Sequence, residues 1–176
     1  MHTATIDTPA GPFTILASDE AVLASGWTED SERLRALIGE ALRPAVDELA
    51  AKRDLGPFTR AVADYVAGDL AAIDAVPVAQ VASPFLERAR AELRRIPPGA
   101  PETYAQLAAR AGNPAAVRAA GSACARNPTA LFVPCHRVVR TGGGLGGFAY
   151  GLDVKRWLLD HESGTSQLRG TDAQPA

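Results

Sequence analysis

Residues 131 to 140, LFVPCHRVVR, place Cys135 between a proline and a histidine at the end of an apolar run. A cysteine reacts as the thiolate, so a reactive cysteine needs a base or a positive charge nearby, and His136 and Arg137 follow directly. Pro134 fixes the backbone φ angle just before the thiol and gives it a rigid support. The pattern points to a nucleophilic thiol. Taken alone, however, Cys135 also fits the commonest fate of a free cysteine, which is burial in a core.

A histidine that serves as base for a nucleophile is usually oriented by a third group, and a carboxylate could fill that role. The downstream candidates are Asp153, Asp160 and Glu162. A helix is expected from Asp153, and Glu162 at its end could reach back toward His136. Because adjacent side chains of an extended strand point to opposite faces, Cys135 and His136 can cooperate only through a turn or a bridging water.

Spacing argues against other cysteine chemistries. No C-x-x-C motif exists, and Val138 stands where a zinc deaminase would have its second cysteine. A phosphatase would need arginine at Thr141. The glycine-rich residues 140 to 151, RTGGGLGGFAYG, lack the Lys-Ser/Thr of a phosphate-binding loop and suit either a pocket wall of main chain or a flexible hairpin tip. Neither a metal nor a cofactor is expected, and Cys124 is assigned to packing.

The charge is distributed unevenly along the chain, although the net charge is only −2. Residues 1 to 84 carry thirteen acidic and six basic side chains, whereas residues 85 to 140 carry nine arginines and only three glutamates. An excess of arginine in one segment creates a local field that attracts phosphates, although a solvated helical face would have the same composition. The middle third is therefore a candidate nucleic-acid surface.

The first 80 residues are expected to form an α/β subdomain. Residues 3 to 26 alternate short apolar runs with turn sequences, which predicts hairpin strands and a small antiparallel sheet. Residues 30 to 42 and 57 to 69 have apolar side chains at helical spacing and predict amphipathic helices packed on that sheet. The uncharged residues 75 to 84, which contain two prolines, are expected to link two subdomains.

The second part of the chain, residues 81 to 163, is expected to be mainly helical. A helix is predicted from residue 85 to residue 96. A second begins at Tyr104 behind a Thr103–Gln106 capping box and ends at Gly112. A third, starting at Asn113-Pro114 and ending before Asn127-Pro128, completes a helix-turn-helix candidate.

The surface of that third helix favours nucleic-acid binding. Its side chains are small except for Arg118, so the helix could lie close to a nucleic-acid backbone while the arginine enters the base stack. Residues 129 to 133, TALFV, then predict a buried strand that leads to Cys135.

No apolar run approaches the ~20 residues that cross a bilayer, and no basic leader precedes an apolar block. We therefore expect no membrane partner, a cytoplasmic location, and two reduced thiols. Residues 164 to 176 are expected to form a disordered tail.

Two segments resemble the O6-alkylguanine-DNA alkyltransferases, also called methylated-DNA–protein-cysteine methyltransferases. They are TYAQLAARAGNPAAVRAAGSACARNPTALFVPCHRVV (residues 103 to 139) and GGLGGFAYGLDVKRWLLDHE (residues 143 to 162), and together they cover about a third of the chain closely. TPAGPFTILASDE and FTRAVADYVAGDL resemble the N-terminal subdomain of that family more weakly.

The resemblance implies direct-reversal repair of duplex DNA containing O6-alkylguanine, in which Cys135 accepts the alkyl group once and irreversibly. His136, acting through a water and oriented by Glu162, would help to form the thiolate. Asn127 would brace the site, and Tyr104 would assist the departing guanine and meet a DNA phosphate. The protein would act as a monomer without cofactor.

The resemblance also assigns two sets of binding residues. After the lesion is flipped out, Arg118 would fill the stack, and its helix would lie in the minor groove. The DNA-binding set is Arg118, Tyr104, Ala119, Ser122 and Arg126. The guanine pocket would comprise Val138, Phe148, Ala149, Tyr150 and Lys155.

The chain departs from the family pattern at several positions. Leu86 replaces the glutamine of a Phe-Gln pair, and Arg90 stands at the position of a tryptophan. The segment IPPGAPETY lacks the usual Gly-Glu-Thr, and Tyr150 stands where many members have glycine. These departures concern the packing of the first C-terminal helix and the size of the pocket.

Two other functions remain compatible with parts of the pattern. A lesion-binding DNA protein would recognise alkylguanine without transferring the group, but such relatives lack the acceptor cysteine. A cysteine hydrolase acting on a small ester would turn over repeatedly and would not need the helix that carries Arg118.

Overall fold

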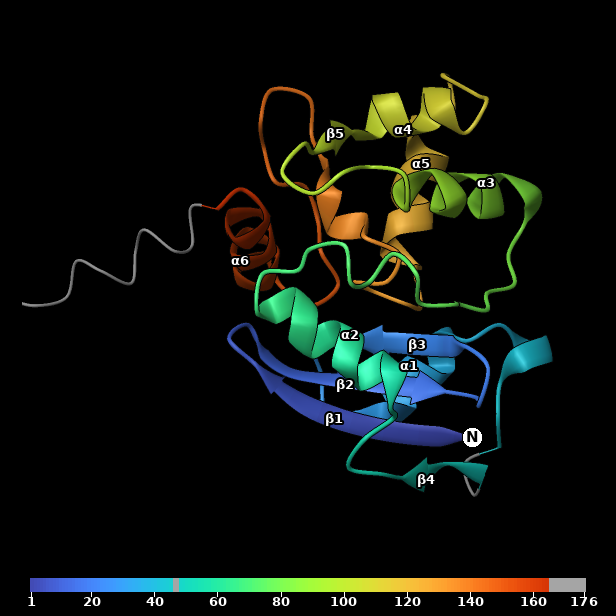
Figure 1. Ribbon diagram of the computed structural model, residues 1–176. Helices are drawn as coiled ribbons and strands as arrows, with labels where there is room; N and C mark the ends of the chain where they lie inside the picture. Colours follow the sequence, from blue (N-terminus) through green and yellow to red (C-terminus); the bar gives the residue numbers. More distant parts are fainter. Residues whose placement is uncertain (46–47, 165–176) are drawn as a thin grey trace, which may run out of the picture.

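The computed structural model describes residues 1–45 and 48–164 (Figure 1). The predicted tail from residue 165 onward lies outside the described residues. The strands are β1 His2–Thr8, β2 Gly11–Ala17, β3 Val22–Gly26, β4 Ala50–Ala51, β5 Glu102–Thr103 and β6 Val138–Val139. The α-helices are α1 Ser31–Leu37, α2 Pro57–Val66, α3 Pro84–Leu93, α4 Tyr104–Arg110, α5 Val117–Ala125 and α6 Leu152–Glu162. The 3-10 helices include η1 Glu40–Leu42 and η3 Cys135–Arg137.

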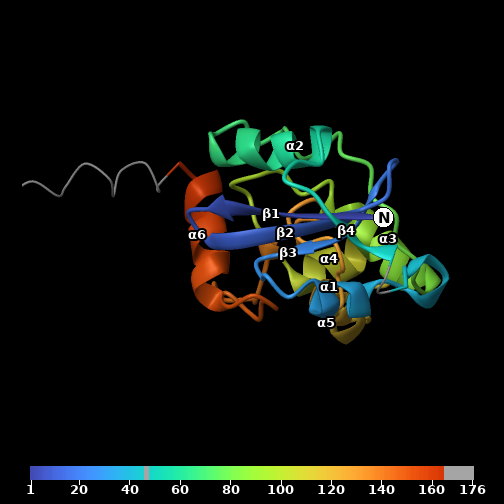
Figure 2. The same ribbon diagram turned by 90° about the horizontal axis from the view of Figure 1, so that it is seen from below.

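The N-terminal sheet has the strand order β3-β2-β1-β4, with β1, β2 and β3 antiparallel and β4 parallel to β1. Alternate side chains of β2 enter different cores: Phe13 and Ile15 pack with α2, whereas Leu16 packs with Leu34 of α1. Figure 2 shows α1 and α2 on opposite sides of the sheet. The expected small sheet with helices packed on it is confirmed, and helices cover both of its faces.

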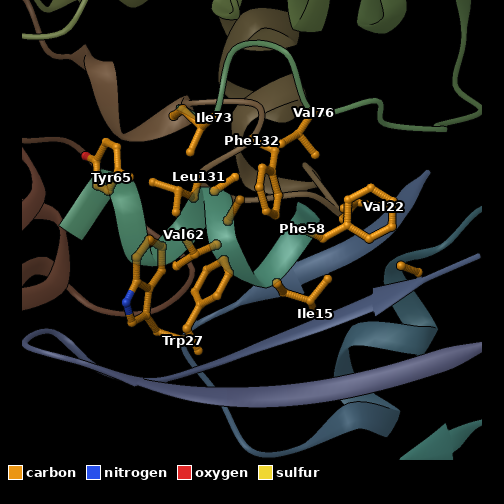
Figure 3. Packing of buried hydrophobic residues seen from close by; sticks show 14 of the residues in the cluster. Ile15, Val22, Trp27, Phe58, Val62, Tyr65, Ile73, Val76, Leu131 and Phe132 are labelled. Atoms are coloured by element: carbon orange, nitrogen blue, oxygen red, sulfur yellow. The ribbon is translucent and has the colours of Figure 1, made fainter. Parts of the chain in front are cut away.

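The α2 side of the sheet shares its core with the segment that precedes Cys135. Leu131 and Phe132 pack among the α2 and sheet residues (Figure 3), and the Phe132 ring centroid lies 6.3 Å from that of Phe13. Leu158 of α6 belongs to the same core. This shared core fixes the position of the Cys135 segment relative to the N-terminal sheet.

The strand predicted for residues 129 to 133 is wrong. The segment is a series of turns, with one isolated bridge from Thr129 to Ser25 and a positive φ of 74° at Leu131. A turn lets Leu131 and Phe132 enter the N-terminal core while Val133 packs with the Cys135 cluster. The left-handed conformation of Leu131 costs about 1–2 kcal/mol, which this burial offsets.

The C-terminal part is mainly helical, as predicted. Small residues allow α3, α4 and α5 to approach closely, because Ala89, Ala111 and Ala123 form one buried cluster. Figure 1 shows these three helices on the opposite side of the molecule from the sheet. The short strands β5 and β6 pair in parallel and connect the start of α4 to the Cys135 segment.

The capping box at the start of α4 is confirmed: Gln106 N donates to Thr103 Oγ1 at 3.2 Å, and Thr103 N donates to Gln106 Oε1 at 2.7 Å. Gly112 follows that helix with a φ of 88°, as a left-handed cap requires. The next helix, however, begins at Val117 rather than at Asn113. The Asn113 side chain accepts a hydrogen bond from Ala115 N at 3.2 Å and holds a turn instead of capping the helix.

The helix predicted over residues 30 to 42 ends at Leu37. Asp30 caps its start by accepting from Arg33 N at 3.0 Å. Ile38 and Gly39 then adopt extended ψ angles of 131° and 143°, and only the short η1 follows. No helix within residues 1–45 and 48–164 is long and apolar enough to cross a membrane.

Candidate active site

Cys135 begins the 3-10 helix η3, directly after Pro134. The tight turn replaces the strand end that the sequence predicted, and it gives Cys135 and His136 a geometry other than the opposite faces of a strand. The residue is only 6% exposed. Its sulfur accepts a hydrogen bond from Asn127 Nδ2 at 3.3 Å. Burial raises the pKa of the Cys135 thiol, and the Asn127 hydrogen bond opposes that shift.

Of the three candidate carboxylates, Glu162 is the one that meets His136. His136 Nε2 lies 2.8 Å from Glu162 Oε1, and both side chains are fully buried. Arg137 donates to the same carboxylate from Nε at 3.1 Å and Nη2 at 2.9 Å. Burial alone would raise the pKa of Glu162, but His136 and Arg137 outweigh it and lower the pKa to about 2. Glu162 is therefore ionised at neutral pH.

The contact with Glu162 determines which nitrogen of His136 carries the proton. An ionised carboxylate only accepts, so Nε2 is the protonated nitrogen and Nδ1 has the free lone pair. Nδ1 is buried and has no hydrogen-bond partner among the described residues. Burial lowers the pKa of His136, against the opposing effect of Glu162. The imidazole is thus neutral at rest and able to accept a proton.

Asn127 follows α5, and its side chain connects the Cys135 sulfur to backbone groups of Thr129 and Val133. Its Nδ2 also donates to the carbonyl oxygen of Val133 at 2.7 Å, while its Oδ1 accepts from Thr129 N at 3.2 Å. The amide orientation is consequently fixed by two backbone groups. This arrangement leaves one N–H of the amide aimed at Cys135.

A cavity of about 370 Å³ opens onto the sulfur. Ligand pockets of this size hold a small molecule, so the cavity can admit a nucleobase. Its walls come from α4, α5, η3 and the glycine-rich loop. The lining residues are Tyr104, Gly121, Cys124, Ala125, Cys135, Gly147, Phe148 and Ala149.

Tyr104 lies against the glycine-rich loop, where a glycine leaves room for its ring and hydroxyl. Gly146 has a φ of 74°, and a Cβ atom on it would lie 2.8 Å from the Tyr104 hydroxyl. Burial raises the pKa of Tyr104, so its hydroxyl is protonated at neutral pH and can donate a hydrogen bond.

Three of the predicted pocket residues do not line the cavity but lie behind its wall: Val138, Tyr150 and Lys155. Lys155 is buried and its Nζ donates to the carbonyl oxygens of Val138 at 2.6 Å and Gly147 at 3.3 Å. It thereby joins β6 to the glycine-rich loop. Tyr150 points toward the N-terminal sheet, where its hydroxyl donates to the carbonyl oxygen of Ser25 at 3.2 Å.

The predicted DNA-binding residues of α5 lie beside this cavity. Arg118 is exposed, and its spacing of three and seven residues from Gly121 and Ala125 places it on the helix face that lines the cavity. Ala119 and Ser122 are half-buried, and Arg126 is exposed at the C-cap.

Arg90, which replaces a tryptophan of the family pattern, is 6% exposed. Its guanidinium donates to the carbonyl oxygens of Ala123 at 3.5 Å and Arg126 at 2.5 Å. A cation at the C-terminal end of a helix donates hydrogen bonds to the free carbonyl groups there. It also interacts favourably with the negative end of the helix dipole. The departure therefore exchanges an apolar contact for a polar cap on α5.

Two contacts to the site were not predicted from the sequence. Tyr65 of α2 donates from its hydroxyl to Glu162 Oε1 at 2.8 Å, and Gln80 contacts Asn127. No local pattern marks either residue, since Tyr65 is read as one apolar position of an amphipathic helix. Within residues 1–45 and 48–164, no group of three or more His, Cys, Asp or Glu side chains is placed to hold a metal ion.

Comparisons with known proteins agree with this geometry. Residues 84–164 match the family model of the 6-O-methylguanine DNA methyltransferase DNA-binding domain. The chain is 39% identical over 158 residues to the methylated-DNA–protein-cysteine methyltransferase of Salmonella typhimurium, covering 89% of this chain and 92% of that protein. It is 33% identical over 162 residues to the protein of the same name from Methanosarcina acetivorans, covering 92% of this chain and 98% of the relative.

The fold is also similar to that of a solved structure. Mycobacterium tuberculosis OGT in complex with DNA superimposes with a TM-score of 0.77 at 27% identity, covering 94% of this chain and 95% of that chain.

Proposed function

Since the chain belongs to the methylated-DNA–protein-cysteine methyltransferase family, we propose that it repairs duplex DNA by moving the alkyl group of O6-alkylguanine onto Cys135. The observation that carries the proposal is the position of the Cys135 sulfur, which lies at a cavity of nucleobase size beside the buried His136–Glu162 pair. The family resemblance implies Cys135 as the acceptor, and this geometry supports the same assignment.

The site is arranged for a single displacement. The Cys135 proton passes through a bridging water to Nδ1 of His136, and the charge that forms there is stabilised by Glu162. The thiolate attacks the alkyl carbon, so that a C–S bond forms as the bond from carbon to guanine O6 breaks. The electron pair stays on guanine, which is protonated with the help of the Tyr104 hydroxyl. A thioether does not hydrolyse, so each molecule reacts once.

The cavity walls hold the base. Phe148 packs on guanine, and backbone groups near Val138 and Ala149 read its edge. Lys155 supports them from behind by holding the Val138 and Gly147 carbonyl groups together. Tyr150 contributes indirectly, because it ties the loop that carries Phe148 and Ala149 to the N-terminal sheet.

The exposed face of α5 binds the duplex. Arg118 fills the stack after the lesion leaves it, and the small Ala119 and Ser122 let the helix approach the minor groove. Arg126 and Tyr104 meet phosphates of the duplex. The similarity to a neighbour solved in complex with DNA supports this surface.

We also infer that the chain is organised in two parts. Residues 1–80 form an α/β subdomain, and residues 81–163 form the DNA-binding and alkyl-acceptor domain. The protein acts as a cytoplasmic monomer and needs no cofactor, because the displacement uses only the side chains described above.

The stoichiometry of repair tests the proposal. The protein is mixed with a fourfold excess of duplex containing one O6-methylguanine, and the nucleosides are quantified over time. Repair should stop when one guanine has been restored per protein molecule. Continued repair would indicate a turnover enzyme, and unchanged O6-methylguanine in a bound duplex would indicate a lesion-recognition protein.

A further inference from the structure

Gln80 lies in the link between α2 and α3, at the boundary between the two proposed subdomains. The link is fastened to β3, since Val22 N donates to the carbonyl oxygen of Pro77 at 2.9 Å and Ala79 N donates to that of Val22 at 3.0 Å. Val22 and Val78 form a parallel bridge there. These backbone bonds hold Gln80 at a fixed place beside the segment that follows α5.

The Gln80 amide reaches the residue that contacts the acceptor sulfur. Its Nε2 donates to Asn127 Oδ1 at 3.0 Å and to Thr129 Oγ1 at 2.5 Å. Asn127 Oδ1 thus accepts from both Gln80 and the Thr129 backbone, while Asn127 Nδ2 donates to Val133 and Cys135. Every side-chain polar atom of Asn127 is engaged, with its donors on the sulfur side.

A chain of hydrogen bonds through an amide is cooperative. A donor at Oδ1 draws electron density from the conjugated group, so the N–H groups at Nδ2 become stronger donors. An ionised sulfur gains more from such a donor than a neutral thiol does. The effect is stronger away from solvent, and Asn127 and Cys135 are only 5% and 6% exposed.

We propose that Gln80 is a positioning residue for the acceptor thiol: it orients and polarises the Asn127 amide and thereby stabilises the thiolate of Cys135. This inference rests on the proposed function only in taking the thiolate as the reacting species. It gives the inter-subdomain link a part in preparing the nucleophile.

Several titratable groups surround Cys135, and the Gln80 variants retain all of them. They are Arg90 of α3, Tyr104 of α4, Cys124 of α5, the adjacent His136, Tyr150 of the glycine-rich loop and Lys155 of α6. Lys155 and Arg90 favour the thiolate by their charge. Within the described residues, Gln80 donates to Asn127 and Thr129 and to none of these groups, so we assign a change in the titration of Cys135 on replacing Gln80 to the amide chain.

The test measures alkylation of Cys135 by iodoacetamide as a function of pH, with peptide mass spectrometry to separate Cys135 from Cys124. Gln80→Met keeps the length of the side chain and removes the donor. Val76→Ala, in the same link, removes packing without touching Asn127 and serves as the matched control. Gln80→Leu provides a second replacement if the methionine variant has melted at the assay temperature.

Losing the amide chain should lower the Cys135 alkylation rate at neutral pH about threefold to tenfold, with the rates converging at high pH. Val76→Ala should leave the pH profile unchanged even if it lowers the melting temperature. The inference is overturned if the Gln80 variants superimpose on the wild type, or if Val76→Ala shifts the profile equally.

A parallel measurement of methyl transfer from duplex O6-methylguanine separates the two proposals. A wild-type protein that transfers the methyl group, combined with unchanged profiles in the Gln80 variants, refutes only the role of Gln80. A wild-type protein that transfers nothing refutes the proposed function, while the titration of the thiol still decides the role of Gln80.

Discussion

Tyr65 and His136 meet on the same oxygen of Glu162, each at 2.8 Å, although they come from helix α2 and from the turn that carries the acceptor cysteine. One buried carboxylate thus connects helix α2 to His136, the proposed proton acceptor of the active site. His161, the neighbour of Glu162, adds a contact from its Nε2 to the Tyr65 carbonyl oxygen at 2.8 Å. The N-terminal part is therefore bonded directly to the residues that we propose prepare the nucleophile.

Removing the Tyr65 hydroxyl should destabilise the protein. Tyr65→Phe keeps the ring in the core but removes one of the donors to a buried carboxylate, so the free energy of unfolding should fall by about 1.5–3 kcal/mol in urea denaturation. Tyr150→Phe is the matched control, because its hydroxyl donates only to a backbone carbonyl at 3.2 Å, and its loss should be smaller. Equal losses in the two variants would show that the Glu162 contact has no special weight.

Glu162 should make the free energy of unfolding depend on pH in the acidic range. Its pKa is lowered from 4.5 to about 2 in the folded protein, so its ionised form stabilises the fold above pH 4.5, and this contribution is lost as the pH falls toward 2. Urea denaturation across this range should show the loss in the wild type. In Glu162→Gln the corresponding slope should be shallower.

The same substitution should lower stability at neutral pH. Glu162→Gln leaves the buried Arg137 without its counter-charge, which should cost about 3–5 kcal/mol. Wild-type and variant curves that remain parallel from pH 4.5 to 2 would contradict the ionised state assigned to Glu162.

Arg118 should matter for duplex DNA and not for chemistry at the sulfur. Arg118→Ala should slow repair of a duplex by roughly tenfold to a hundredfold, while the reaction with free O6-benzylguanine stays near the wild-type rate. The control is Arg95→Ala, an exposed arginine of the C-terminal part that pairs with Glu92. Similar losses on duplex and free base would rule out a role confined to the DNA stack.

Arg33 should affect the reaction with free base and the repair of duplex DNA alike. Its Nη2 donates to the Ala149 carbonyl oxygen at 2.7 Å, and its guanidinium lies 5.3 Å from the Tyr150 ring centroid, so it fastens the cavity wall to α1. Arg33→Leu should slow the reaction with free base and with duplex by a similar factor of about three to ten. Arg35→Leu, on the same helix, loses a pair with Glu32 and should change neither rate. A loss confined to duplex DNA would contradict this role.

The sequence predicted the elements that depend on local patterns. Apolar spacing located α2, and the Thr103–Gln106 pair located the start of α4. Helix spacing left Asp153, Asp160 and Glu162 as candidate partners of His136, and the family resemblance implied Glu162, which is the carboxylate that contacts His136.

The errors arose where a side chain or a tertiary contact overrode the local pattern. Asn113 bonds to Ala115 and delays α5, an alternative that spacing does not reveal. An apolar run such as residues 129 to 133 does not distinguish a strand from a buried turn, because both bury successive side chains. The contacts of Tyr65 and Gln80 join residues 97 and 47 positions apart, and only the folded chain brings them together.

The most direct test of the account is peptide mass spectrometry after the protein has reacted with a duplex that contains one O6-methylguanine. The mass of one methyl group should appear, once only, on the peptide that contains Cys135, while the peptide that contains Cys124 remains unmodified. A bound duplex with no mass change, or a methyl group on Cys124, would contradict the assignment of Cys135 as the acceptor.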